Sequence, residues 1–301
     1  MLSDQRASVS TPLLSIDYET AGDPLGPAVV LMHGFPYDVR AYDEVAEIVG
    51  AAGARVVVPY LRGFGRTRFL ADDTNRSGQQ AALGRDLIDL LDALDIDQAV
   101  VAGYDWGGRA ACIAAALFPD RVRGLVTVDG YNIQDIAHSA TPAPPDWEKT
   151  YWYQYYFHSE RGRIGLTENR EALCGLLWRD WSPTWADAAT AFTASAPSLH
   201  NPDFVDVVIH SYRHRFGLEA GDPRYDDLER RIAESPEITV PTVVIESGAD
   251  GVAGGNPADD RQYFTGPYTH LVLPGIGHNV PQEDPGTFAR AVLSLLDNER
   301  G

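Results

Sequence analysis

The chain has 301 residues, 44% of them hydrophobic and 22% charged, with a formal net charge of −19 and two cysteines. This composition is typical of a soluble globular protein, and the acidic balance argues against nucleic acid or an anionic membrane as a partner and favours neutral over anionic substrates. No apolar run approaches the roughly 18 residues that span a bilayer, the first residues lack the apolar core of a signal peptide, and two cysteines make no disulfide framework, so we expect a cytoplasmic protein.

Short apolar runs typical of buried strands alternate with helix-prone segments along most of the chain. The expected strands cover residues 13–18, 29–32, 56–59, 100–102, 125–128, 243–246 and 271–273. The expected helices between them include 39–49, 80–94 and 109–117. Strands buried on both faces are continuously apolar, and their alternation with helices predicts an α/β fold built on a mostly parallel, doubly wound sheet.

The alternation stops after Val128 and resumes near residue 239. A proline-rich linker at 141–145 opens the intervening region, followed by an aromatic, helix-prone block and a further helical stretch, with no confident strand. We therefore expect a helical lid at residues 131–237, inserted between a first core segment, 1–130, and a second, 238–301.

A carboxylate follows the strand expected at 100–102. The run Gly103-Tyr104-Asp105-Trp106-Gly107-Gly108 fits a nucleophile elbow, G-x-Nuc-x-G, whose glycines allow a sharp strand-to-helix turn. An aspartate with a free pKa of about 3.9 is ionised at neutral pH and attacks an sp³ carbon without a base. Attack on an ester would give an anhydride, so Asp105 favours epoxide opening or halide displacement. A cap on the following helix is the alternative role for this carboxylate.

Further parts of a catalytic site follow other expected strands. The loop His33-Gly34-Phe35-Pro36 is placed to aim the Phe35 N–H at a developing oxyanion, with the Trp106 N–H as a second donor. The Phe35–Pro36 bond is a candidate for the cis form. His278, on a loop after the last strand, is placed to act as a general base.

Three carboxylates compete for the role of the acid that orients His278. Asp250 lies just beyond the strand expected at 243–246, where this acid is anticipated. Asp129, directly after the strand at 125–128, is a substitute, and Glu246 is a third candidate within a strand pattern.

The chain order of nucleophile, acid and histidine, together with the loop and the lid, resembles the α/β-hydrolase superfamily from about residue 13 onward. Within it, Gly-x-Asp-Trp-Gly-Gly and His-Gly-Phe-Pro are similar to the epoxide hydrolases and the related haloalkane and haloacid dehalogenases. Residues 152–157 and 210–213 resemble the lid segments of epoxide hydrolases that carry two ring-opening tyrosines, here Tyr153 and Tyr212. Tyr104 departs from the pattern, because the relatives commonly have histidine there.

The resemblance implies that Asp105 opens an epoxide and forms an alkyl-enzyme ester, which water activated by His278 hydrolyses to a vicinal diol. Tyr153 and Tyr212 would protonate the leaving oxygen, since phenols remain protonated at neutral pH. No cofactor or metal is implied. Residues expected to contact the substrate are His33, Pro36, Trp152 and Tyr156.

Two alternatives remain open. A dehalogenase would use the same Asp105, with the Trp106 indole binding halide. A non-catalytic hydrolase-fold protein would bind a small hydrophobe without turnover. The aromatic lid residues also fit simple packing. They favour an apolar or aromatic epoxide as substrate, whereas the exact substrate, its stereochemistry and the oligomeric state are not set by the sequence.

Overall fold

A nine-stranded sheet forms the centre of the computed structural model, which describes residues 6–252 and 258–296. The strand order is β1-β2-β4-β3-β6-β7-β8-β9, and β5 pairs with β2. The strands are β1 Arg6–Ser10, β2 Leu14–Gly22, β3 Ala28–Met32, β4 Arg55–Pro59, β5 Arg68–Phe69, β6 Ala99–Gly103, β7 Val122–Val128, β8 Thr242–Ser247 and β9 Tyr268–Leu273. The strands from β4 to β9 in this order are parallel and only β1, β2 and β5 are antiparallel, which confirms the predicted α/β class.

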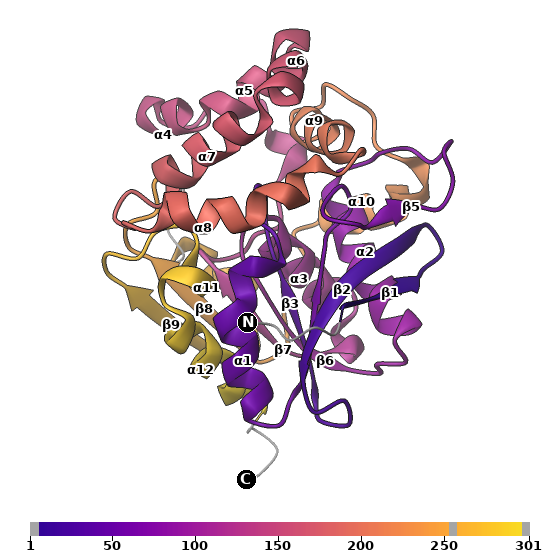
Figure 1. The fold of residues 1–301 in the computed structure, drawn as a ribbon, viewed down its shortest axis with the longest axis vertical. Helices are drawn as coiled ribbons and strands as arrows, with labels where there is room; N and C mark the ends of the chain where they lie inside the picture. Colours follow the sequence, from indigo (N-terminus) through magenta and orange to yellow (C-terminus); the bar gives the residue numbers. More distant parts are fainter. Residues whose placement is uncertain (1–5, 253–257, 297–301) are drawn as a thin grey trace.

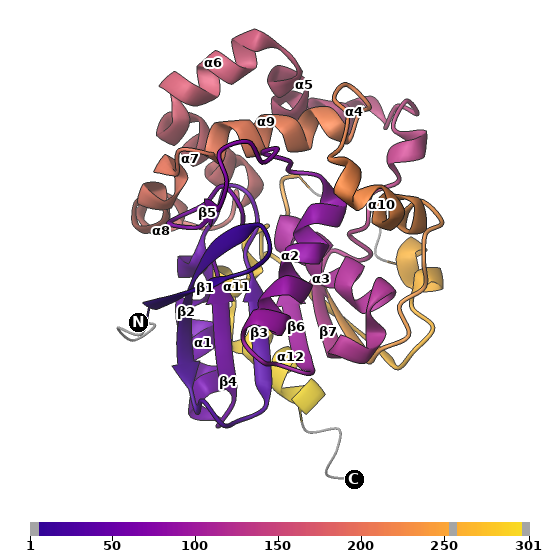
Figure 2. The same cartoon turned by 90° about the vertical axis from the view of Figure 1, so that its right-hand side faces the viewer.

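Helices cover both faces of the sheet, with α1, α11 and α12 on one face and α2 and α3 on the other (Figures 1 and 2). The helices are α1 Asp43–Ala51, α2 Gln80–Ala93, α3 Asp105–Leu117, α4 Pro145–Thr150, α5 Trp152–His158, α6 Glu160–Glu168, α7 Arg170–Trp181, α8 Ala188–Ser195, α9 Phe204–His214, α10 Asp226–Ile232, α11 Val280–Glu283 and α12 Pro285–Leu296. Because both faces are covered, the central strands β3, β4 and β6 bury nearly every side chain, as their apolar sequences require.

Between β7 and β8 the chain forms helices α4 to α10, and no strand lies among these described residues. Helices α4 to α9 lie over the end of the sheet at which β3 and β6 finish (Figures 1 and 2). Helix α10 instead packs against α2, where the Glu229 carboxylate accepts a hydrogen bond from the Ala81 N–H at 3.2 Å. The insertion therefore combines a helical cover over one end of the sheet, α4 to α9, with a final helix, α10, that packs on the core.

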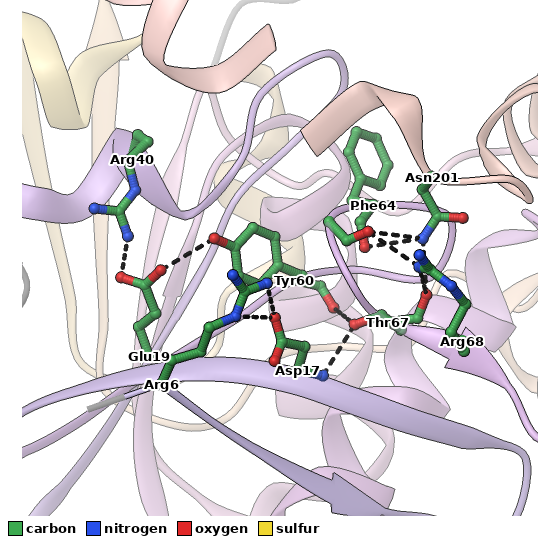
Figure 3. Close-up of polar contacts among 10 residues, drawn as sticks. Arg6, Asp17, Glu19, Arg40, Tyr60, Phe64, Thr67, Arg68 and Asn201 are labelled. Carbon is green, nitrogen blue, oxygen red and sulfur yellow. Dashed lines mark hydrogen bonds and ion pairs between the residues drawn. The ribbon is translucent and has the colours of Figure 1, made fainter. Parts of the chain in front are cut away.

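The cover is fastened to the core by a buried amide. Asn201, between α8 and α9, donates to the carbonyls of Phe64 at 3.1 Å and Thr67 at 2.7 Å (Figure 3). The Thr67 hydroxyl donates to the Tyr60 carbonyl at 2.8 Å and accepts from the Asp17 N–H of β2 at 3.1 Å (Figure 3). This chain of hydrogen bonds connects the insertion to the sheet.

Candidate active site

A strained turn presents the Asp105 side chain at the end of β6. Asp105 has φ 51°, a left-handed conformation that non-glycine residues rarely adopt, and α3 begins at this residue. A Cβ on Gly103 would lie 2.4 Å from the Gly107 carbonyl carbon, and a Cβ on Gly107 would lie 1.9 Å from the Met32 oxygen. Both glycines are therefore needed for the close approach of strand and helix, and the turn has the form expected of a nucleophile elbow.

The loop after β3 holds one oxygen of this carboxylate. The Phe35 N–H donates to Asp105 Oδ1 at 2.7 Å, and the Phe35–Pro36 bond is cis, as the sequence suggested. A Cβ on Gly34 would lie 2.5 Å from Asp105 Oδ1, so only glycine leaves room for the carboxylate. Burial opposes ionisation of Asp105, but the neighbouring His278, Arg109 and the Phe35 N–H together bring its pKa below the usual value. Asp105 is therefore ionised at neutral pH.

His278 lies between two carboxylates. Its Nδ1 is 2.6 Å from Asp250 Oδ2, while its Nε2 is 3.8 Å from Asp105 Oδ2, beyond hydrogen-bond distance. Nε2 is buried and has no hydrogen-bond partner within the described part of the chain. Burial lowers the pKa of His278, but the charges of Asp250 and Asp105 outweigh it and raise the pKa well above the ordinary value. The ring is thus oriented by Asp250 and aims a free nitrogen at the nucleophile.

The competing acids have other partners. Asp129 accepts hydrogen bonds from the Ser247 N–H, at 2.8 Å, and from its hydroxyl. Burial and the charge of Asp250 raise the pKa of Asp129 to about 7. Glu246 pairs with His270 at 2.9 Å. Oxygen and nitrogen atoms of Asp129, Asp250 and His278 lie within 4.8 Å of one another, which is the spacing of a metal site. All three residues already take part in hydrogen bonds, Asp129 with Ser247 and Asp250 with His278.

A cavity of about 750 Å³ opens in front of this constellation and is lined by Asp105, Asp250, His278 and Tyr153. The Tyr153 hydroxyl accepts a hydrogen bond from Gln154 Nε2 at 3.1 Å. Tyr212 is buried beside Tyr153, and the two rings meet edge to face with centroids 5.4 Å apart. Burial raises the pKa of both phenols, so both remain protonated donors.

The four residues predicted to contact substrate do not line this cavity. His33 is fully buried and serves the loop: its Nδ1 lies 2.9 Å from the Gly34 carbonyl, and its Nε2 accepts from the Leu61 N–H at 3.1 Å. Burial lowers the pKa of His33 to about 4. The Pro36 carbonyl accepts from the Trp178 indole at 3.0 Å. Trp152 and Tyr156 pack against each other in α5, with ring centroids 6.2 Å apart.

Two arginines line the cavity that the sequence analysis did not single out, Arg109 and Arg215. Arg109 is four residues after Asp105 in α3, and Arg215 is three residues after Tyr212 at the end of α9. Residues three or four apart share a helix face, so both were detectable as neighbours of residues already selected.

A family model for the alpha/beta hydrolase fold matches residues 27–285, and the chain belongs to this family. Relatives of this chain indicate which type of α/β hydrolase it resembles. A crystal structure of a "putative epoxide hydrolase" from Klebsiella pneumoniae is 43% identical, with a TM-score of 0.96 and 98% of both chains covered. Epoxide hydrolase A of Mycobacterium tuberculosis is 26% identical, with 92% of both chains covered. The AB hydrolase superfamily protein YfhM of Bacillus subtilis is 30% identical, with 97% of both covered.

The chain is therefore a hydrolase, of the epoxide hydrolase-like type within the α/β-hydrolase family. Within residues 6–252 and 258–296, no helix has both the length and the apolar character needed to cross a membrane.

Proposed function

We propose that this enzyme opens an epoxide to a vicinal diol through a covalent ester on Asp105. The observation that carries the proposal is the shared cavity, which brings the ionised Asp105 carboxylate, the Tyr153 hydroxyl and the free Nε2 of His278 to one space. A nucleophile, a proton donor for the leaving oxygen and a base for water are the three groups that this reaction needs. The epoxide hydrolases among the relatives agree with it.

In the first step Asp105 Oδ2 attacks an epoxide carbon, because Oδ1 is held by the Phe35 N–H. The C–O bond of the ring breaks and the leaving oxygen takes the proton of Tyr153. The new ester is neutral, which removes one of the two charges that raise the pKa of His278. His278 then releases its proton, which restores Tyr153, and becomes a neutral base.

In the second step neutral His278 takes a proton from water and the hydroxide attacks the ester carbonyl. The Phe35 N–H, already at this oxygen, stabilises the tetrahedral oxyanion, with the Trp106 N–H at the start of α3 as the second donor. Collapse releases the diol and returns Asp105 to its carboxylate.

A single turnover in heavy-oxygen water tests the covalent path. The first product molecule should carry no label, and the label should appear in the peptide containing Asp105. Labelled product from the first turnover would mean that water attacks the epoxide directly, which would refute the scheme.

Dehalogenation is the second candidate, favoured by one observation. The Trp106 indole N–H is buried without a hydrogen-bond partner among the described residues, as a halide-binding donor would be. Trp106 does not line the cavity, however, whereas Tyr153 does. Parallel assays of halide release from haloalkanes and haloacids and of diol formation from epoxides would separate the two activities.

A further inference from the structure

Two buried guanidinium groups face the catalytic cavity without carboxylate partners. Arg215 is 9% exposed and Arg109 is 7% exposed, and both line the cavity that holds Asp105. Neither has an ion pair within 4.0 Å among the described residues. Arg215 Nε and Nη2 are buried and have no hydrogen-bond partner within this part of the chain.

The hydrogen bonds of these arginines are few and long, and Arg215 also stacks over an aromatic ring. Arg215 Nη1 donates to Gln154 Oε1 at 3.3 Å, and its guanidinium carbon lies 4.3 Å from the centre of the Tyr212 ring. Arg109 Nε donates to the Asn132 carbonyl at 3.4 Å. Burial and the nearby charge of Arg215 lower the pKa of Arg109 to about 10, so it remains protonated at neutral pH.

The contrast with Arg62 shows how this protein treats a structural buried arginine. Arg62 is 1% exposed and binds both oxygens of Asp86 at 2.6 and 2.7 Å, the Ser77 carbonyl at 2.7 Å and the Tyr225 hydroxyl at 3.1 Å. Its donors are satisfied from within the fold. A buried charge that is left unpaired is strongly unfavourable, and the free donors of Arg215 have no partner among the described residues, so a bound ligand could supply one.

We propose that Arg215 and Arg109 form an anion subsite that binds a carboxylate on the epoxide substrate. This inference rests on the proposed function and names its substrate class: epoxides that carry a carboxylic acid. Guanidinium groups bind carboxylates through paired N–H···O bonds, and Arg215 offers two free donors for such a contact.

A singly charged carboxylate fits this cavity better than a phosphate. Five acidic residues line the same space: Asp105, Asp129, Asp135, Glu148 and Asp250. A dianion would be repelled by these carboxylates more strongly than a monoanion. Two arginines provide enough charge to bind one carboxylate while the remaining acids disfavour a second negative charge.

Arg215 also has a contact that suggests a different role. Its Nη1 binds Gln154 Oε1, and Gln154 Nε2 binds the Tyr153 hydroxyl, so the arginine is connected to the proposed proton donor. If this support of Tyr153 were its sole role, loss of Arg215 would slow all epoxides by the same factor. A carboxylate subsite instead predicts a loss that is confined to charged substrates.

The test compares an ω-epoxyalkanoate series, with one to three methylenes between the groups, against the matched primary amides. The wild-type enzyme should show kcat/KM about 10- to 100-fold higher for the best carboxylate than for its amide, the range expected for charge-assisted hydrogen bonds. Arg215→Met should abolish this preference and Arg215→Lys should restore part of it. Arg230→Met, which removes an exposed arginine of α10, should preserve it. Equal losses for acid and amide in Arg215→Met would refute the subsite.

Binding without chemistry separates the subsite from the proposed reaction. Saturated alkanoates of matching length should raise the Tm of the wild-type enzyme, and the corresponding amides should not, because a ligand that binds only the folded state stabilises it. Arg215→Met should lose the shift. If alkanoates bind in this way and no epoxide is turned over, the subsite stands and the epoxide hydrolase assignment fails. If neutral epoxides are turned over and alkanoates give no shift, the subsite fails alone.

Discussion

Removal of the Tyr153 hydroxyl should slow epoxide opening far more than removal of the Tyr212 hydroxyl. Tyr153 lines the cavity with Asp105, whereas Tyr212 does not line it and packs edge to face against the Tyr153 ring. The Tyr153 ring packs against Trp181 and Tyr212, with centroids 5.2 and 5.4 Å away, and phenylalanine keeps both contacts. Tyr153→Phe therefore removes a proton donor with little change in packing.

The two positions differ in the expected size of the effect. Loss of a donor that acts directly on the developing alkoxide typically raises the barrier by about 2.7–4 kcal/mol, a factor of roughly 10² to 10³ in rate. Tyr212→Phe removes a hydroxyl from a residue that does not line the cavity, so its effect should not exceed that of an ordinary hydrogen bond, about 0.5–1.5 kcal/mol or a factor of roughly 2 to 10. The double variant should resemble Tyr153→Phe, because only Tyr153 of the two tyrosines lines the cavity.

Single-turnover measurements report the opening step directly. Trp106 and Trp181 lie beside the nucleophile and the base, so rapid-mixing tryptophan fluorescence should follow formation of the ester. Diol release measured in the same variants gives the overall rate. Tyr212→Phe should leave ester hydrolysis unchanged. A Tyr212→Phe rate of opening below that of Tyr153→Phe would make Tyr212 the main donor. Normal opening in the double variant would contradict a role for either tyrosine and favour dehalogenation.

Three further predictions concern charged groups. His278→Gln should accumulate the ester, seen by intact-protein mass spectrometry as enzyme plus one substrate mass, and normal turnover would exclude His278 as the base. Asp250→Asn should slow ester hydrolysis and Asp129→Asn should have a much smaller effect, because Asp250 hydrogen-bonds the His278 ring whereas Asp129 is bound to Ser247. The reverse order in rapid-quench kinetics would assign the acid to Asp129. Burial lowers the pKa of His33 from the ordinary 6.5 to about 4 in the folded protein. Below pH 6.5 the unfolded chain therefore binds a proton that the folded protein does not, and the fold loses up to about 3 kcal/mol of stability as the pH falls toward 4. His33→Gln should flatten that part of the pH dependence in urea unfolding, and an unchanged slope would refute it.

The central strands were predictable because burial on both faces leaves a direct signature. The runs at 29–32, 56–59 and 100–102 are continuously apolar, and each lies within an observed strand. The edge strand β1, Arg-Ala-Ser-Val-Ser, was not predicted, because its side chains are mostly exposed and its polar sequence does not differ from a loop. Helix α3 begins at Asp105 rather than Arg109, because helix propensity does not reveal where a strained elbow ends.

Some residues of the candidate site were predictable from the sequence and others were not. Asp105 and His278 each follow a strand, so their positions in the order of strands and loops made them predictable from the sequence. Both line the same cavity in the structure. Arg215 could not be predicted in this way, because a basic residue at the end of a lid helix has no distinct sequence signature. Its burial and its free donors arise from the packing of the insertion over the core, which local sequence does not encode.

The net charge of −19 favoured a neutral substrate, but a net charge describes the field outside the protein and not the inside of a cavity. Exposed charges are screened over about 8 Å at physiological salt, whereas buried charges are screened much less. A carboxylate at Arg109 and Arg215 would therefore respond chiefly to those two groups and to the acids beside it. Held there, the substrate would present its epoxide to Asp105 from a fixed anchor, and such orientation lowers the barrier of a bimolecular step. The spacer between acid and epoxide would then decide which ring carbon meets the nucleophile, so regiochemistry should change along the epoxyalkanoate series and lose this dependence in Arg215→Met.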